Sequence, residues 1–139
     1  MQIRQLGLDE LDSAYDVVRE LRPALGYEEF EELIYAMRHQ EYRMYGIFEG
    51  ATLATFAGVS VRVSLEHRRH LLIEDFVTRS EFRRRGYGRE MLRYLGDTAR
   101  IFRCEQLLLS SELHKGSGGR TFLESEGFEE RATAFLKPL

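Results

Sequence analysis

Apolar residues in the first forty positions recur every three or four residues, which is the spacing of one helix face. The first helical pattern follows Asp9, a residue type that caps helix N-termini, and stops at Pro23. The second runs from Phe30 to Met37 behind a cluster of glutamates, which the helix dipole favours near a first turn. A short strand pattern at residues 3–6 precedes both. The chain is therefore predicted to begin with one strand and two helices.

The pattern then changes to the alternation of half-buried strands. Residues 42–48 and 52–64 flank a turn at Glu49 and Gly50, and they predict an antiparallel hairpin. Gly58 lies inside the second of these strands and indicates a β-bulge. The chain thus passes from helices to a sheet near residue 42.

Two acids interrupt the next predicted strand, residues 70–78. Glu74 and Asp75 stand between two apolar stretches of this strand. Because successive side chains of a strand point to opposite faces, Asp75 is expected on the face opposite Glu74. An exposed or ion-paired acid is the simplest explanation of either residue, and it stays open at this point.

The second half of the chain contains a strand-loop-helix-strand unit. A loop rich in arginine and glycine at residues 83–89 leads into a helix with an apolar face over 91–102, and the apolar strand 107–109 follows. A short helix at 121–126 and a last strand at 128–136 complete the chain. The predicted order of elements is therefore β-α-α-β-β-β-α-β-α-β.

Size and composition narrow the class of protein. The 139 residues fit one domain, residues 1–139, and 43% hydrophobic residues support a packed core. A net charge of −3 does not favour a nucleic-acid-binding protein, and no apolar run approaches the ~20 residues of a membrane-spanning helix. The start lacks a secretory signal pattern, which favours a cytoplasmic location. Cys104 is the only cysteine, which excludes an internal disulfide and a site of several thiolates.

The loop between the 70–78 strand and the next helix concentrates the candidate chemistry. Glycines allow a close approach of the backbone to a ligand, and the first N–H groups of a helix lack intrahelical partners. With the helix dipole and charge-assisted contacts from arginines, such an element suits a pyrophosphate. A solvated surface turn is the alternative. The loop reads Arg83-Arg84-Arg85-Gly86-Tyr87-Gly88-Arg89.

Residues 74–88 resemble the acetyl-CoA signature of the GNAT N-acetyltransferase superfamily, R-x-x-G-x-G/A after the strand that holds the cofactor. Residues 116–128 are similar to the family's C-terminal segment N-x-x-A-x-x-F-Y-x-x-x-G-F. The details most resemble the small-amine branch, such as polyamine and aminoalkylphosphonate acetyltransferases. The resemblance implies an α/β (α+β) fold with a mixed, mostly antiparallel central sheet of about six strands, flanked by about four helices.

The resemblance also implies how acetyl-CoA, the acetyl donor, is bound. Backbone groups of Phe76, Val77 and Thr78 would pair with the pantetheine arm, and main-chain amides from Arg84 through Arg89 would cradle the pyrophosphate. No metal is implied. The full set of candidate cofactor-binding residues is Phe76, Val77, Thr78, Arg83, Arg84, Arg85, Gly86, Tyr87, Gly88 and Arg89.

Glu74 occupies the position of the catalytic glutamate of the polyamine branch. An alkylammonium with a pKa of ~10.4 is deprotonated in only about one molecule in 2,500 at pH 7, so a general base is useful. His114 is a second candidate for proton transfer, or else a solvated loop histidine. Leu123 stands where the family usually has a tyrosine that protonates the departing thiolate, so this catalytic role lacks its usual side chain.

The resemblance predicts an enzyme that transfers the acetyl group of acetyl-CoA to a primary amine of a small molecule, by direct attack in a ternary complex. Four glutamates near residue 30 favour a cationic acceptor, whereas Arg38, Arg43 and Arg62 suit one that also bears a phosphonate or carboxylate. A peptide or protein N-terminus is a further acceptor. A non-catalytic acyl-CoA-binding or regulatory module is the alternative that Leu123 supports. No nucleic-acid or membrane partner is expected, and a homodimer stays open.

Overall fold

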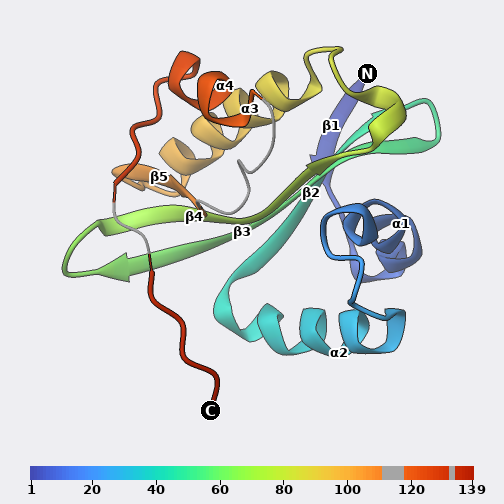
Figure 1. Cartoon of the computed structure of the whole chain (residues 1–139), viewed down its shortest axis with the longest axis horizontal. Helices are drawn as coiled ribbons and strands as arrows, with labels where there is room; N and C mark the ends of the chain where they lie inside the picture. Colours follow the sequence, from blue (N-terminus) through green and yellow to red (C-terminus); the bar gives the residue numbers. More distant parts are fainter. Residues whose placement is uncertain (111–117, 132–133) are drawn as a thin grey trace.

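One five-stranded sheet forms the centre of the structure, a computed structural model that describes residues 1–110, 118–131 and 134–139 (Figure 1). The strands lie in chain order, and neighbours from β1 to β4 are antiparallel, whereas β4 and β5 are parallel. Their bounds are β1 (Gln2–Gln5), β2 (Tyr42–Glu49), β3 (Thr52–Ser64), β4 (Arg68–Thr78) and β5 (Gln106–Leu109).

Helices cover both faces of this sheet. On one side lie α1 (Leu11–Leu21) and α2 (Tyr27–Met37), and on the other lie α3 (Tyr87–Ile101) and α4 (Gly119–Ser125) (Figure 1). The predicted fold class is confirmed, and so is the predicted order of helices and strands through α4. Three short 3-10 turns join these elements at η1 (Leu8–Glu10), η2 (Arg38–Gln40) and η3 (Ser80–Phe82).

The predicted sixth strand at residues 128–136 is wrong for the part of that segment that the structure describes. Residues 128–131 and 134–136 are not in a strand. Phe128 instead packs against the apolar cluster beneath α3 and α4, and its N–H donates to the carbonyl of Leu123, which closes the turn after α4. Phe128 therefore reflects packing against α3 and α4 rather than strand alternation, whereas Phe135 and Leu136 are exposed.

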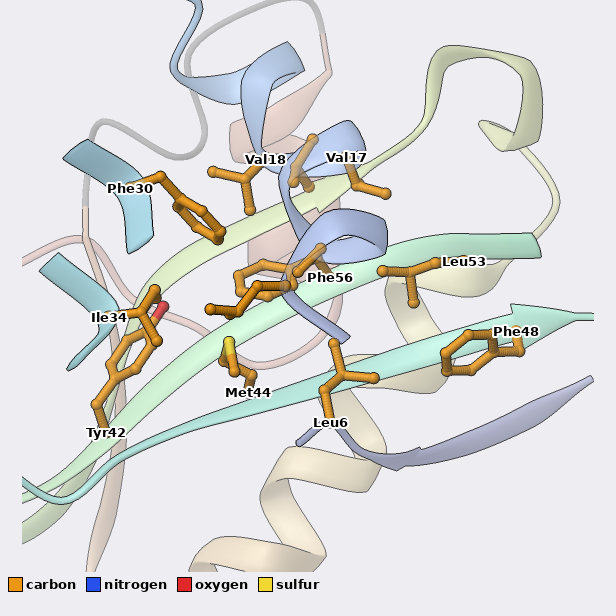
Figure 2. Close-up of a cluster of buried hydrophobic side chains, with 13 residues drawn as sticks. Leu6, Val17, Val18, Phe30, Ile34, Tyr42, Met44, Phe48, Leu53 and Phe56 are labelled. Carbon is orange, nitrogen blue, oxygen red and sulfur yellow. The ribbon is translucent and has the colours of Figure 1, made fainter. Parts of the chain in front are cut away.

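Two apolar clusters hold the helices to the sheet, one on each face. Figure 2 shows the cluster under α1 and α2, where Val17, Val18, Phe30 and Ile34 meet Phe56 at the middle of β3. The second cluster joins α3 to the opposite side of β2, β3 and β4. Alternation along β3 supplies both clusters, as expected for a sheet buried on its two faces. Tyr35 of α2 lies outside the cluster under α1 and α2 and is 43% exposed.

A bulge divides β4 at Glu74. Gly58 of β3 pairs with Asp75, whereas the next residue of β3, Val59, pairs with Ile73. One additional residue, Glu74, is therefore inserted in β4. The irregularity expected at Gly58 is confirmed, although the inserted residue belongs to the neighbouring strand.

A glycine is needed at position 58 because a side chain would not fit there, not because the backbone makes a turn. A Cβ atom built at this position would overlap the hydroxyl and ring of Tyr42. Tyr42 belongs to the neighbouring strand β2, and its side chain extends over β3. The absence of a side chain at Gly58 thus allows the Tyr42 ring to pass over the sheet toward β4.

We expect Gly58→Ala to lower the free energy of unfolding by about 1–3 kcal/mol, the cost of overpacking a core. Chemical denaturation followed by circular dichroism measures this change. Gly96→Ala is the matched control: Gly96 lies inside α3 with only the end of a flexible arginine near its Cβ position. That substitution should stabilise the protein by about 0.5–1 kcal/mol. Equal effects of the two variants would contradict the steric explanation.

Candidate active site

The strands β4 and β5 separate beyond Ile73. Their pairing ends at Ile73 and Leu109, whereas β4 continues to pair with β3 as far as Thr78. Among the described residues, the β5-side edge of β4 from Asp75 to Thr78 therefore has no neighbouring strand. Backbone groups at such an edge are available to an extended ligand, which adds to the sheet as another strand would.

The loop after β4 ends at the first turn of α3. Gly86 has φ of 85° and is the N-cap of this helix, and the N–H of Glu90 makes the bond to the Gly86 carbonyl that begins the helical series. The preceding N–H groups of the first turn have no intrahelical acceptor, so they form a site for an anion. A Cβ at Gly86 would meet nothing within 4 Å, so the glycine is required for its left-handed backbone and not for space.

The arginines of this loop are exposed, and three of them contact other side chains. Arg83 lies 3.6 Å from Glu20, and its Nε donates to the carbonyl of Thr78. Arg89 lies 3.4 Å from Glu126, and Arg85 stacks over the ring of Phe82 at 5.1 Å. Their positive charge surrounds the helix N-terminus, while the directional donors of this anion site are main-chain amides.

The two remaining candidates of the loop are Tyr87 and Gly88. The side chain of Tyr87 is buried, and its hydroxyl donates to the carboxylate of Glu49, which fastens the start of α3 to the end of β2. Gly88 lies beneath the rings of Phe122 and Phe76, within ordinary contact distance of its Cβ position. The contacts of both residues therefore position the start of α3.

Glu74 and Asp75 share one face of the sheet. The expectation that they point to opposite faces is wrong, because the bulge at Glu74 interrupts the alternation of β4. Both line a cavity of about 570 Å³ that α1 and α2 enclose with the ends of β4 and β5. The cavity adjoins the point at which β4 and β5 separate. Its acids therefore lie beside the open strand edge.

Asp75 is the centre of a buried polar network. Its Oδ1 accepts a hydrogen bond of 2.8 Å from Nε of Arg22, and its Oδ2 accepts one of 2.8 Å from the hydroxyl of Tyr42. Arg22 also donates to the carbonyl of Glu74. The residue that follows α1 and a residue of β2 thus meet at one carboxylate of β4, that of Asp75, which is 9% exposed. Both of its oxygens are occupied, which makes Asp75 a structural acid.

The environment of Tyr42 keeps its hydroxyl protonated. Burial, followed by the negative charge of Asp75 and the hydrogen bond to it, raises the pKa of Tyr42 well above its usual value. The hydroxyl is therefore a permanent donor to Asp75 at neutral pH.

Glu74 is held differently. Its carboxylate accepts a hydrogen bond from the hydroxyl of Ser60, and the guanidinium of Arg62 lies 3.6 Å from its Oε1. The side chain is 26% exposed and lines the cavity. The carboxylate therefore has a fixed orientation and remains accessible to a group in the cavity, which are the geometric requirements of a general base.

The other residues discussed from the sequence lie apart from this carboxylate or outside the described residues. Leu123 is partly buried in the apolar cluster that includes Phe76 and Phe122. His114 and the start of the 116–128 segment lie outside the residues that the structure describes. His70 is buried, and its Nδ1 is 2.9 Å from the carbonyl oxygen of Arg68.

Three residues of the site were not identified from the sequence, namely Arg22, Tyr42 and Ser60. They come from three elements and meet the acids only through long-range packing. In the hairpin of β2 and β3, Tyr42 lies opposite Ser60 and diagonal to Gly58. An aromatic residue often covers a glycine of the neighbouring strand in this way.

Comparison with known proteins assigns the family. The profile of the acetyltransferase (GNAT) family matches residues 8–128. The chain is 30% identical over 132 residues to the uncharacterized N-acetyltransferase YhdJ of Bacillus subtilis (strain 168). The aligned region covers 94% of this chain and 93% of YhdJ. The chain therefore belongs to the GNAT family and is an acetyltransferase.

Solved structures share the fold over the whole chain. A structure from Agrobacterium tumefaciens str. C58, assigned as an acetyltransferase, superposes with a TM-score of 0.82 at 25% identity and covers 100% of both chains. The glucosamine-6-phosphate N-acetyltransferase of Arabidopsis thaliana has a TM-score of 0.77 at 19% identity, with 99% of this chain and 97% of that chain covered. At that identity the second likeness shows the fold alone.

The family generally uses acetyl-CoA as its acetyl donor. In residues 1–110, 118–131 and 134–139, no group of three or more His, Cys, Asp or Glu side chains is arranged to hold a metal ion. No helix in the same ranges has the length and apolar character needed to cross a membrane.

We expect Tyr42→Phe to lower the free energy of unfolding at pH 7 by about 1–3 kcal/mol, because Asp75 loses one of its buried donors. The raised pKa of Tyr42 gives this difference a pH dependence. The unfolded tyrosine ionises near pH ~10, whereas the folded one stays protonated, so the stability that Tyr42 contributes is complete below pH ~10 and declines above it. The gap between wild type and variant should therefore narrow between about pH 10 and 11.

Denaturation at a series of pH values measures this gap. Tyr35→Phe is the matched control, since Tyr35 is exposed on α2, and its effect should stay within about 0.5 kcal/mol. A constant gap between wild type and Tyr42→Phe across the alkaline range would contradict the described network.

Proposed function

We propose that the protein transfers the acetyl group of acetyl-CoA to the primary amine of a small molecule, by direct attack within a ternary complex. One observation carries the proposal: the accessible carboxylate of Glu74 lies where the edge of β4 becomes open. A donor along that edge and an acceptor in the cavity would meet at this carboxylate.

The donor is proposed to bind through the backbone. Phe76, Val77 and Thr78 lie on the edge of β4 that has no neighbouring strand among the described residues, so their backbone groups can pair with the pantetheine arm. The free amides at the start of α3 would hold the pyrophosphate, with the exposed arginines 83–85 and 89 around it. The open edge and the left-handed N-cap at Gly86 both fit this use.

Glu74 is proposed as the general base. It would take a proton from the acceptor ammonium, directly or through one water, and so release the nitrogen lone pair for attack on the thioester carbonyl carbon. The carbon–sulfur bond then breaks, the sulfur leaves with the electron pair, and the attacking nitrogen loses its second proton to water. Ser60 and Arg62 would keep the carboxylate in position. Asp75 would contribute by fixing β4 against α1 and β2, not by contact with the reacting atoms.

Protonation of the leaving thiolate does not depend on Leu123 in this scheme. A leucine has no proton to donate, but an alkyl thiol has a pKa of ~8.5, so its thiolate is a tolerable leaving group that water can protonate. Leu123 also favours the second candidate, a module that binds acetyl-CoA without turnover. Release of thiol in the presence of an amine separates the two, because the module would bind acetyl-CoA and release none.

We expect Gly86→Val to weaken CoA binding at least about tenfold, because a β-branched residue resists the left-handed conformation that the N-cap requires. Isothermal titration with CoA measures the affinity, and thermal unfolding checks that the variant is folded. Arg84→Ala is the control that removes a charge but keeps the backbone, and its loss should be smaller. Unchanged affinity in folded Gly86→Val, or a larger loss in Arg84→Ala, would count against a backbone phosphate site.

We expect Glu74→Gln to lower kcat/KM at neutral pH by roughly 10²–10⁴, the usual contribution of a general base. The amide keeps the shape and a partner for Ser60 but cannot take a proton, so activity should partly recover at high pH, where more of the amine is neutral. CoA affinity should change little. Glu66→Gln, on an exposed glutamate of the turn before β4, should leave kcat/KM as in wild type. Wild-type rates for Glu74→Gln at every pH would place the base elsewhere.

A further inference from the structure

We infer that the acceptor is a primary amine with a single positive charge and an apolar body, such as an alkyl or aryl group. This inference rests on the proposed function, since it takes the cavity beside Glu74 as the acceptor site. It separates this class from two others that the sequence left open, polyamines and amines that carry a phosphonate or carboxylate.

The wall of the cavity is apolar over most of its area. Three of its sides come from α2, β4 and β5, and the carboxylate of Glu74 lies where the last two separate. Its volume of about 570 Å³ lies within the range of sites for small organic ligands. The apolar residues that define it are Phe30, Leu33, Ile34, Met37, Leu72 and Leu108.

Phe30 and Ile34 are buried in the core, but the other apolar side chains of the wall are at least partly exposed. Leu33 is 45% exposed, although it lines the cavity, and Met37 is only partly buried. An apolar group placed in the cavity would remove this surface from water, and the gain grows with the apolar area buried. An acceptor with a hydrocarbon body is therefore expected to bind this cavity more tightly than a polar one.

The charges around the cavity do not favour a polycation. Among the described residues, Arg22 and Asp75 form an ion pair at 2.8 Å, and Arg62 lies 3.6 Å from Glu74, so the charges of these two arginines balance those of the two carboxylates. The acidic cluster that suggested a polyamine lies elsewhere: Glu28, Glu29 and Glu32 are exposed on α2 and do not line the cavity. A second or third ammonium group would meet apolar walls and lose its hydration.

Of the three arginines that suggested an anionic group on the acceptor, two stack on aromatic rings outside the cavity, and the third, Arg62, already faces the carboxylate of Glu74. Arg38 lies over the exposed ring of Tyr35 at 5.1 Å, and Arg43 lies over the ring of Phe102 at 4.5 Å. Neither lines the cavity, and Arg62 faces Glu74. Arg22 does line it, but it already donates to Asp75 and to the carbonyl of Glu74. A phosphonate or carboxylate would therefore compete with these existing contacts.

The test is a panel of primary amines with acetyl-CoA, followed by release of free thiol. Propylamine, butylamine, pentylamine and hexylamine vary the apolar body alone, and 2-phenylethylamine supplies an aromatic one. We expect kcat/KM to rise roughly fourfold for each added methylene, the factor that its transfer free energy implies. Spermidine and 2-aminoethylphosphonate should be at least about tenfold poorer than hexylamine, since each carries a charge into the apolar wall.

Two substitutions on α2 test where this selectivity arises. Leu33→Asp places a carboxylate on the cavity wall at a half-exposed position that tolerates a polar side chain, and it should lower kcat/KM for hexylamine at least about tenfold while changing that for propylamine less. Leu33→Met, which keeps an apolar side chain at this position, should keep the increase of kcat/KM with chain length. Glu29→Gln, an exposed residue of the same helix outside the cavity, should leave the ranking unchanged. Circular dichroism checks that each variant folds.

The possible outcomes separate this inference from the proposed function. Thiol release that rises with chain length and falls in Leu33→Asp supports both. Turnover of spermidine, of 2-aminoethylphosphonate or of a leucine-initiated peptide in preference to hexylamine, or a rate independent of chain length, overturns the inference and leaves the amine acetyltransferase in place. No thiol release with any amine, while CoA still binds, overturns the proposed function and the inference with it.

Discussion

The additional residue in β4 is the constraint on which the site depends. In a regular strand the carboxylates of Glu74 and Asp75 would face opposite sides of the sheet, and one would enter the apolar cluster beneath α3. Because β4 contains one residue more than β3 at this point, both face α1 and α2. Asp75 then joins β4 to Arg22 and Tyr42, whereas Glu74 remains accessible. One irregularity thus gives two adjacent acids different environments.

The network around Asp75 makes this arrangement specific. A buried carboxylate is costly unless its hydrogen bonds and charge are matched, and here an arginine and a tyrosine whose pKa is raised by burial match both oxygens. The Tyr42 ring reaches Asp75 only because Gly58 has no side chain. The shape of the cavity beside Glu74 therefore depends on a glycine of the neighbouring strand, and the same packing holds α1 at the cavity wall.

The sequence predicted the features that depend on local pattern. Helices α1, α2 and α3 have regular apolar spacing and were located from it. The arginine- and glycine-rich segment 83–89 was placed after β4, as the structure has it, although its last three residues already form the first turn of α3. Sequence-based prediction was wrong where packing between residues distant in the chain determines the structure. The side of the sheet that Asp75 faces depends on a bulge whose inserted residue is not marked by any local pattern, and Phe128 packs against a cluster instead of forming a strand. Arg22 and Ser60 reach the acids only in the folded chain.

The central claim is that the open edge of β4 binds the acetyl donor, whereas Glu74 of the same strand faces the acceptor. A crystal structure with CoA bound tests it most directly. The account expects the pantetheine amides to pair with the backbone of residues 76–78, the pyrophosphate to accept from the first-turn amides of α3, and the sulfur to lie near Glu74, with room for an amine or one water between them. A pantetheine arm away from this edge, or a sulfur on the far side of the sheet from Glu74, would contradict it.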